Sequence, residues 1–179
     1  MKLMLSNVRL SFPNLFEAKQ VQGQGEPQFG CSLLFAKDHP AYKALLAAVE
    51  EVGKAKWAAK WPEVKKAIAV KDRSAIHDGD AKSTYQGFEG NFFVSASNKV
   101  RPTTIDRDKS PLTAQDGKLY AGCYVNASVE VWAQDNTHGK GVNVSLRGVQ
   151  FAADGEAFSA GGAADADEFE DASQEDELV

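Results

Sequence analysis

Cysteine is scarce in this sequence, and its two cysteines, Cys31 and Cys123, lie far apart and outside any C-x-x-C pair. This excludes a disulfide framework and a cysteine-rich zinc module. Long apolar runs are also missing, which excludes a membrane-spanning helix. The short, polar N-terminus lacks the features of a secretory signal peptide. We therefore expect a cytosolic protein whose cysteines are small buried residues of a reducing compartment.

Basic residues are missing from one part of the chain. Residues 154–179 contain ten acids and neither Lys nor Arg. The first 153 residues keep the other 15 acids and all 20 Lys and Arg, a net charge of +5, although the whole chain carries −5. A net-positive body beside an acidic segment predicts a polyanionic partner for the body.

The acidic segment contains mostly Gly, Ala, Ser and like charges, with too little apolar surface to offset the entropy of ordering. We expect a folded domain over 1–153 and a disordered acidic tail over 154–179. A solubilising tail is the simplest interpretation. Apolar residues among the acids favour a partner-binding tail, because such a residue can anchor in a pocket while the carboxylates steer the approach. The tail residues expected to bind a partner are Phe169, Asp176, Glu177, Leu178 and Val179.

Alternating apolar and polar residues predict strands over 2–12, 28–36, 91–97, 122–133 and 142–151. The strongest is 122–133. Every second residue from Cys123 to Ala133 is apolar, and the residues between them, which include Trp132, are expected to face solvent. A polar loop joins the last two strands into a hairpin. Helical spacing predicts a helical segment over about 40–59 and 62–69, interrupted by Pro62.

This order of elements predicts a mainly β fold with an antiparallel sheet and an inserted helical segment. An OB-fold, a five-stranded antiparallel Greek-key barrel with one helical connection, fits it. A β-sandwich is the alternative. Trp57 and Trp61 lie one helical turn apart, and we favour core contacts against the sheet over base stacking for them.

One cluster resembles a metal site. His77, Asp78 and Asp80 lie together in the sequence, and Asp106 and Asp108 could join them around Mg²⁺ in a hydrolytic nuclease. The Asp-Gly pair within the cluster is also typical of a simple polar turn, which we favour. Motifs of serine hydrolases, phosphate-binding loops and metalloproteases are absent. We expect a protein that is not an enzyme and has no cofactor.

Basic and aromatic residues alternate in three segments, 9–16, 71–88 and 99–120. Binding of single strands without sequence readout needs cations along a groove and flat side chains for stacking. Each segment alone is equally typical of a core aromatic beside a solvated charge. Their recurrence in a net-positive body makes nucleic-acid binding a real candidate.

The run Val8-Arg9-Leu10-Ser11-Phe12-Pro13-Asn14-Leu15-Phe16-Glu17 resembles the N-terminal signature of a bacteriophage single-stranded DNA-binding protein family, the Enc34-like proteins, once catalogued as a domain of unknown function. Further similar motifs follow in order, and together they span nearly all of residues 2–152. These motifs are Asp78-Gly79-Asp80, Tyr85-Gln86-Gly87, Arg101-Pro102, Ile105-Asp106, Tyr120-Ala121-Gly122-Cys123-Tyr124-Val125-Asn126, and Gly141-Val142 with Leu146-Arg147-Gly148-Val149-Gln150.

The resemblance implies an OB fold and non-catalytic binding of single-stranded DNA in phage replication or recombination, in the cytoplasm of the host bacterial cell. It also implies an acidic tail that recruits replication or recombination proteins and competes with DNA, and by analogy a homodimer. The residues expected to contact phosphates are Arg73, Lys82, Lys99, Arg101 and Arg147. Those expected to stack on bases, with weak sequence preference, are Phe12, Tyr85, Phe88 and Tyr120. A metal-dependent nuclease centred on Asp78 and Asp80 and a phage structural or protein-interaction β-domain are the alternatives.

Overall fold

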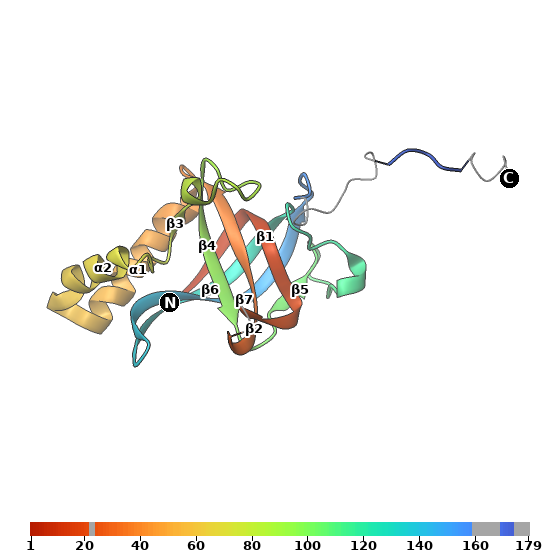
Figure 1. The fold of residues 1–179 in the computed structure, drawn as a ribbon. Helices are drawn as coiled ribbons and strands as arrows, with labels where there is room; N and C mark the ends of the chain where they lie inside the picture. The colour runs from red at the N-terminus through yellow and green to blue at the C-terminus, as the bar shows by residue number, and fades with distance from the viewer. Residues whose placement is uncertain (22–23, 159–168, 174–179) are drawn as a thin grey trace.

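Five strands close into a barrel around the core of this protein (Figure 1). The computed structural model describes residues 1–21, 24–158 and 169–173. The barrel strands are β1 (Lys2–Val21), β2 (Gln24–Ala36), β4 (Asn91–Asn98), β6 (Tyr124–Asn136) and β7 (Gly139–Ala153). Their order is β4-β2-β1-β6-β7, and a parallel pairing of Ser97 with Ser145 joins β4 to β7 and closes the ring. The other neighbours are antiparallel, so the predicted OB-type barrel is confirmed over the sandwich.

Strand β1 runs well past the predicted end at Phe12. A register shift lies between Ser11 and Asn14, and Phe12 has a φ of 47° there. A bulge of this kind bends a strand and tolerates the missing backbone donor of Pro13. Strand β1 lies between β6 and β2, and its pairs with β6 end at Arg9, where its pairs with β2 begin. Two short strands that the sequence pattern did not reveal, β3 (His77–Asp78) and β5 (Thr103–Ile105), extend the sheet edges.

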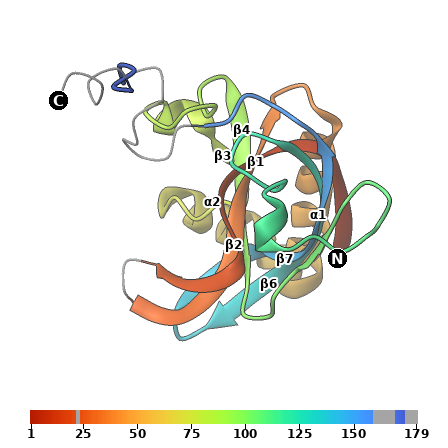
Figure 2. The same cartoon turned by 90° about the vertical axis from the view of Figure 1, so that its right-hand side faces the viewer.

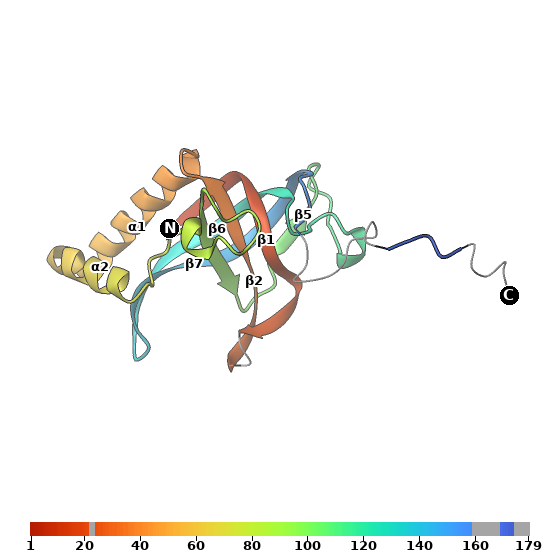
Figure 3. The ribbon, with the colours of Figure 1, turned by 45° about the horizontal axis from the view of Figure 1, so that its top comes forward.

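The predicted helical segment forms two helices between β2 and β3. They are α1 (Pro40–Trp57) and α2 (Trp61–Val70), separated by a 3₁₀ turn over Ala58–Lys60. His39 starts α1, because its Nδ1 accepts a hydrogen bond from the Ala41 backbone at 2.9 Å. The helices lie together at one end of the barrel (Figures 1 and 3) and behind it in Figure 2. No helix in the described parts of the chain is long and apolar enough to span a membrane.

The core combines the inward parity of every barrel strand with the inner face of the helices. Val8, Leu33, Val94 and Val129 are fully buried examples. Trp57 and Trp61 are buried as predicted, with their rings stacked at 5.6 Å. Both cysteines are buried and free, and burial raises the pKa of the Cys31 thiol to about 12, so it stays protonated and unreactive.

Gly53 provides a test of this packing, because a Cβ there would overlap the Trp61 indole. On an exposed helix, Gly→Ala stabilises by about 1 kcal/mol. Here Trp61 is held against Trp57, so overpacking, at about 1–3 kcal/mol, should outweigh that gain. We expect Gly53→Ala to lower the free energy of unfolding by about 1 kcal/mol in urea titrations.

Ala58→Gly is the matched control at the end of the same helix. Ala58 is exposed and has a φ of 49°, which glycine adopts without strain. This variant should unfold at a higher urea concentration than the wild type. A stabilised Gly53→Ala protein would show that the Trp61 ring is free to move aside.

Candidate nucleic-acid interface

A cleft of about 720 Å³ opens on the outside of the barrel, over the seam between β4 and β7. Its walls come from β2, β4, the β6–β7 hairpin and the segment before β3. In OB folds, oligonucleotides bind on the second and third barrel strands, beside the loop that joins the fourth to the fifth. These elements are β2, β4 and the β6–β7 hairpin here, so the cleft lies where an OB fold holds its ligand.

Three cationic side chains line the cleft: Arg73, Lys99 and Lys140. Arg73 donates from Nη1 to the His138 carbonyl at 3.0 Å and so ties its segment to the hairpin. Lys99 pairs with Glu26 at 2.7 Å and holds the pKa of that carboxyl below its usual range. Both partners of this pair are solvent-exposed, and exposed pairs contribute little free energy. A phosphate could therefore take the place of Glu26 at low cost.

Trp132 gives the cleft an aromatic surface. Its side chain is 39% exposed, and its Nε1 donates to the Ser145 hydroxyl at 2.8 Å. This bond holds the indole on the outer face of the hairpin. Serine, asparagine and glutamine side chains form most of the remaining lining. Cations, one exposed ring and neutral polar groups together suit a flexible strand with phosphates and bases.

His77 also lines the cleft, with its ring stacked on Phe93 at 5.1 Å. Burial lowers the pKa of His77, which Asp72 partly opposes. The imidazole is therefore neutral at pH 7 and adds no positive charge to the cleft. The charge there comes from Arg73, Lys99 and Lys140.

The five cations expected to contact phosphates do not share one groove. Only Arg73 and Lys99 line the cleft. Lys82 lies on the 3₁₀ turn after β3. The Arg101 guanidinium packs over the Phe16 ring at 5.3 Å, and Arg147 lines a separate hollow.

The predicted stacking residues lie apart from the cleft as well. Phe12 and Tyr85 are about half exposed and meet edge to face at 5.1 Å. Phe88 is only 2% exposed and packs against Phe93 in a small core cluster. It offers no free ring face, which removes it from the stacking set. The Tyr120 hydroxyl hydrogen-bonds the Asp154 carboxylate at 2.9 Å, so the start of the acidic segment lies beside it.

Residues 154–158, here called the strap, lie against the barrel. The Phe158 ring covers the Arg9 guanidinium at 4.3 Å, and Arg9 donates to the Glu156 carbonyl at 2.7 Å. The Phe158 amide donates to the Ala121 carbonyl at 2.9 Å. Further along, the Phe169 side chain is 71% exposed. The remaining tail residues expected to bind a partner, Asp176 to Val179, lie outside the described residues.

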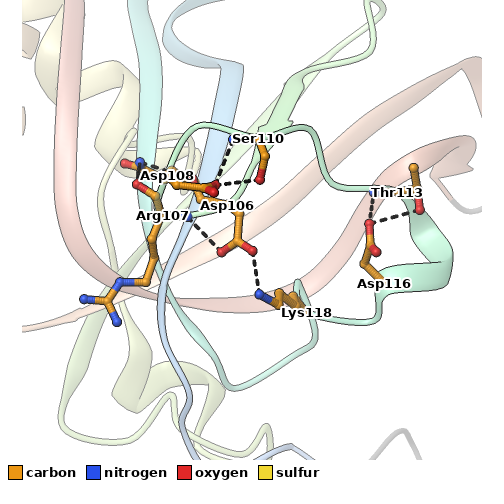
Figure 4. Close-up of polar contacts among 8 residues, drawn as sticks. Asp106, Arg107, Asp108, Ser110, Thr113, Asp116 and Lys118 are labelled. Carbon is orange, nitrogen blue, oxygen red and sulfur yellow. Dashed lines mark hydrogen bonds and ion pairs between the residues drawn. The ribbon is translucent and has the colours of Figure 1, made fainter.

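The acids that the nuclease alternative requires are each bonded to other groups of the protein. Asp78 and Asp80 both face Lys37, at 3.3 and 2.8 Å. Asp106 pairs with Lys118, which lowers the pKa of that carboxyl, and Asp108 accepts from Ser110 inside the same loop (Figure 4). Across the described residues, no group of three or more His, Cys, Asp or Glu side chains is arranged to hold a metal ion. These acids shape two turns.

Sequence reasoning missed Trp132, Lys140 and His77 as cleft residues. A signal for Trp132 existed, since a large aromatic on the solvent parity of a strand is uncommon and invites a ligand. Lys140 lies in the polar hairpin loop, where one lysine looks like an ordinary solvated charge. Trp132 and Lys140 share the β6–β7 hairpin, and His77 lies beside them only because β4 meets β7. No local sequence pattern encodes that contact.

The closed barrel and its cationic, indole-bearing cleft define an OB-fold protein with a site suited to a polyanionic strand. The family model described as "Enterobacter phage Enc34, ssDNA-binding protein" matches residues 1–179. The chain belongs to this family.

Individual relatives agree with this assignment. Protein p50 of Acyrthosiphon pisum secondary endosymbiont phage 1 is 48% identical over 184 aligned residues, covering 100% of this chain and 99% of p50. The single-stranded DNA-binding protein of bacteriophage Enc34, solved in complex with ssDNA, is 26% identical with a TM-score of 0.74, covering 88% of this chain and 89% of that one. Bacteriophage T7 gp2.5, a single-stranded DNA binding protein, shares the fold at 13% identity and a TM-score of 0.60, covering 95% and 97% of the two chains.

The neutral His77 predicts a pH dependence of stability. Above about pH 6.5, the ordinary pKa of histidine, the folded and unfolded states are both neutral at this residue. Below it the unfolded chain binds a proton that the folded chain resists, so the free energy of unfolding should fall as pH drops. We expect His77→Gln to flatten this decline in urea titrations between pH 7.5 and 5.5.

His138→Gln is the matched control, because it removes another imidazole from the cleft lining. An equal flattening in that variant would show that the decline does not belong to His77.

Proposed function

We propose that this chain is a non-catalytic single-stranded DNA-binding protein of phage replication or recombination. The observation that carries the proposal is the cleft on the OB-fold binding face, with Arg73, Lys99 and Lys140 beside an exposed indole. The solved family member in complex with ssDNA supports it, since that protein shares the fold and 26% of its residues with this chain.

The strand runs along the cleft with its phosphates on the three cations and a base on Trp132. Stacking contributes about 1–3 kcal/mol per base and accepts every base, so sequence preference is weak. Phe12 and Tyr85 provide a second stacking surface for nucleotides that leave the cleft. The protein acts in the cytoplasm of the host bacterium and protects exposed single strands there.

The acidic segment regulates this binding. Residues 1–153 form the DNA-binding domain, and the strap fixes the point at which the acidic tail leaves it. Beyond Phe158 the chain carries eight acids and no base, so it competes with DNA for the cationic cleft. Once DNA displaces it, Phe169 and the terminal residues are available to replication or recombination proteins.

The salt dependence of binding tests which cations contact phosphates. Each contact with a single strand contributes about −0.7 to the log–log slope of affinity against salt. The three cleft cations predict a slope of about −2 for short oligo-dT, and Lys140→Gln should reduce it to about −1.4. Fluorescence anisotropy titrations from low to high salt measure both slopes.

Arg147→Gln is the matched control, since Arg147 lies outside the cleft. It should leave the slope at the wild-type value. A wild-type slope of about −3.5, reduced by Arg147→Gln, would instead favour five contacts spread over the barrel. No dependence on salt would refute the electrostatic cleft.

Shortening the chain after Phe158 tests the competition. The strap remains and the eight acids are lost, so affinity for oligo-dT should rise several-fold at low salt and converge with the full chain at high salt. A full-length variant with these acids changed to Asn and Gln is the control for chain length, and it should bind like the shortened protein. Equal affinity of all three proteins at low salt would exclude competition by the tail.

A further inference from the structure

A second hollow lies between the two helices and the barrel, beside the cleft, with which it shares Ser74, Ala75, His77 and Val142. It has a volume of about 300 Å³ and is mostly apolar, with Tyr42, Leu46 and Val49 from α1 and Trp61 and Ile68 from α2. We call it the helix pocket. Leu46 is 38% exposed there, although it is a large apolar side chain on a surface helix. An apolar pocket of this size fits one or two side chains of a peptide.

The helices around this pocket carry most of the net positive charge of the body. Residues 40–71 contain seven Lys and three Glu, a net charge of +4 out of the body's +5. Lys65 and Asp78 line the pocket, and each is in an ion pair, with Glu50 and Lys37 respectively. Lys43 and Lys66 follow pocket residues directly in the helices and are exposed. The surface therefore presents an apolar hollow within a positive field.

The best match for such a surface is an aromatic residue among acids. Phe169 follows Glu168 and precedes Glu170 and Asp171, and its side chain is solvent-exposed. DNA would match the positive charge and leave the apolar hollow unused. An acidic peptide with a phenyl anchor matches both features, because the ring fills the hollow and the carboxylates meet the lysines.

The position of residues 169–173 favours the pocket of another molecule. This segment lies beyond the end of the barrel opposite α1 and α2, as Figures 1 and 3 show. Residues 169–173 are therefore separated from the helix pocket of their own molecule by the barrel, whereas the helices of a following molecule can lie directly beside them.

We propose that Phe169 of one molecule docks in the helix pocket of a second copy. This is a head-to-tail contact, and such contacts build open filaments wherever the rotation between copies does not close into a ring. This step rests on the proposed function: single-stranded DNA that binds several copies aligns them and raises their effective concentration for one another. A weak tail contact then yields cooperative coating of a long strand.

Complementation between two full-length variants tests this docking. Leu46→Glu places a carboxylate in the pocket, and Phe169→Ala removes the anchor. Loss of an interface anchor should weaken self-association at least about tenfold in sedimentation experiments at low salt. An equimolar mixture should recover one-to-one complexes, because one variant supplies the tail and the other supplies the pocket.

Val70→Glu is the matched control, since Val70 is 86% exposed on α2 and does not line the pocket. It should associate like the wild type. Failure of the mixture to complement, or an equal loss in Val70→Glu, would overturn the docking.

Binding to an oligo-dT that holds one molecule separates this inference from the proposed function. Leu46→Glu and Phe169→Ala should both retain wild-type affinity there while losing cooperativity on long poly-dT. If the wild type did not bind the short oligonucleotide, the proposed function would fail, and sedimentation would still decide the docking. If Leu46→Glu and Val70→Glu weakened oligonucleotide binding equally, the helices would be a DNA surface and the docking would be refuted.

Discussion

The bend in β1 is the constraint on which the rest of the structure depends. This strand pairs with β6 up to Arg9 and with β2 from Arg9 onward, and it has a register shift in each part, between Leu5 and Val8 and between Ser11 and Asn14. Barrel closure requires strands that tilt and curve, and bulges of this kind bend a strand. The curve lets β4 reach β7, and the cleft lies on the seam that results. The site is therefore a consequence of closure.

The net charge of the body does not show where on the body the charge lies. The body's excess of +5 suggested a basic DNA groove, yet four of those charges lie on residues 40–71 and only +1 remains for the rest. The cleft is cationic because three side chains converge there while nearby carboxylates are drawn into exposed pairs or turns. Local arrangement determines phosphate binding, since screening limits the reach of exposed charges to about 10 Å. The excess on the helices needs a separate explanation, and a partner for the helix pocket supplies one.

The barrel was predictable from the sequence because its strands alternate cleanly. The apolar parity from Cys123 to Ala133 identified β6, and Pro62 marked the division of the helical segment. The end of β1 was not predictable, since Pro13-Asn14 is typical of a turn and continues here only through a bulge supported on both sides. The residues of the site were even harder to predict from the sequence. Arg73 and Lys99 reach the cleft, whereas Phe88, with the same local signature as Tyr85, became core because the segment over 79–90 folds it inward against Phe93.

The strap links the two roles proposed for the acidic tail. Arg9 is held by Phe158 and the Glu156 carbonyl, so the tail begins at a fixed point instead of at the end of β7. Tethering at a fixed point raises the effective concentration of a segment at surfaces within its reach. Two such surfaces are cationic: the cleft of the same molecule and the helices of the next. In the proposed scheme, DNA that binds to the cleft removes the first surface and, by aligning copies, presents the second. One short segment would then oppose binding by a single molecule and favour binding by many.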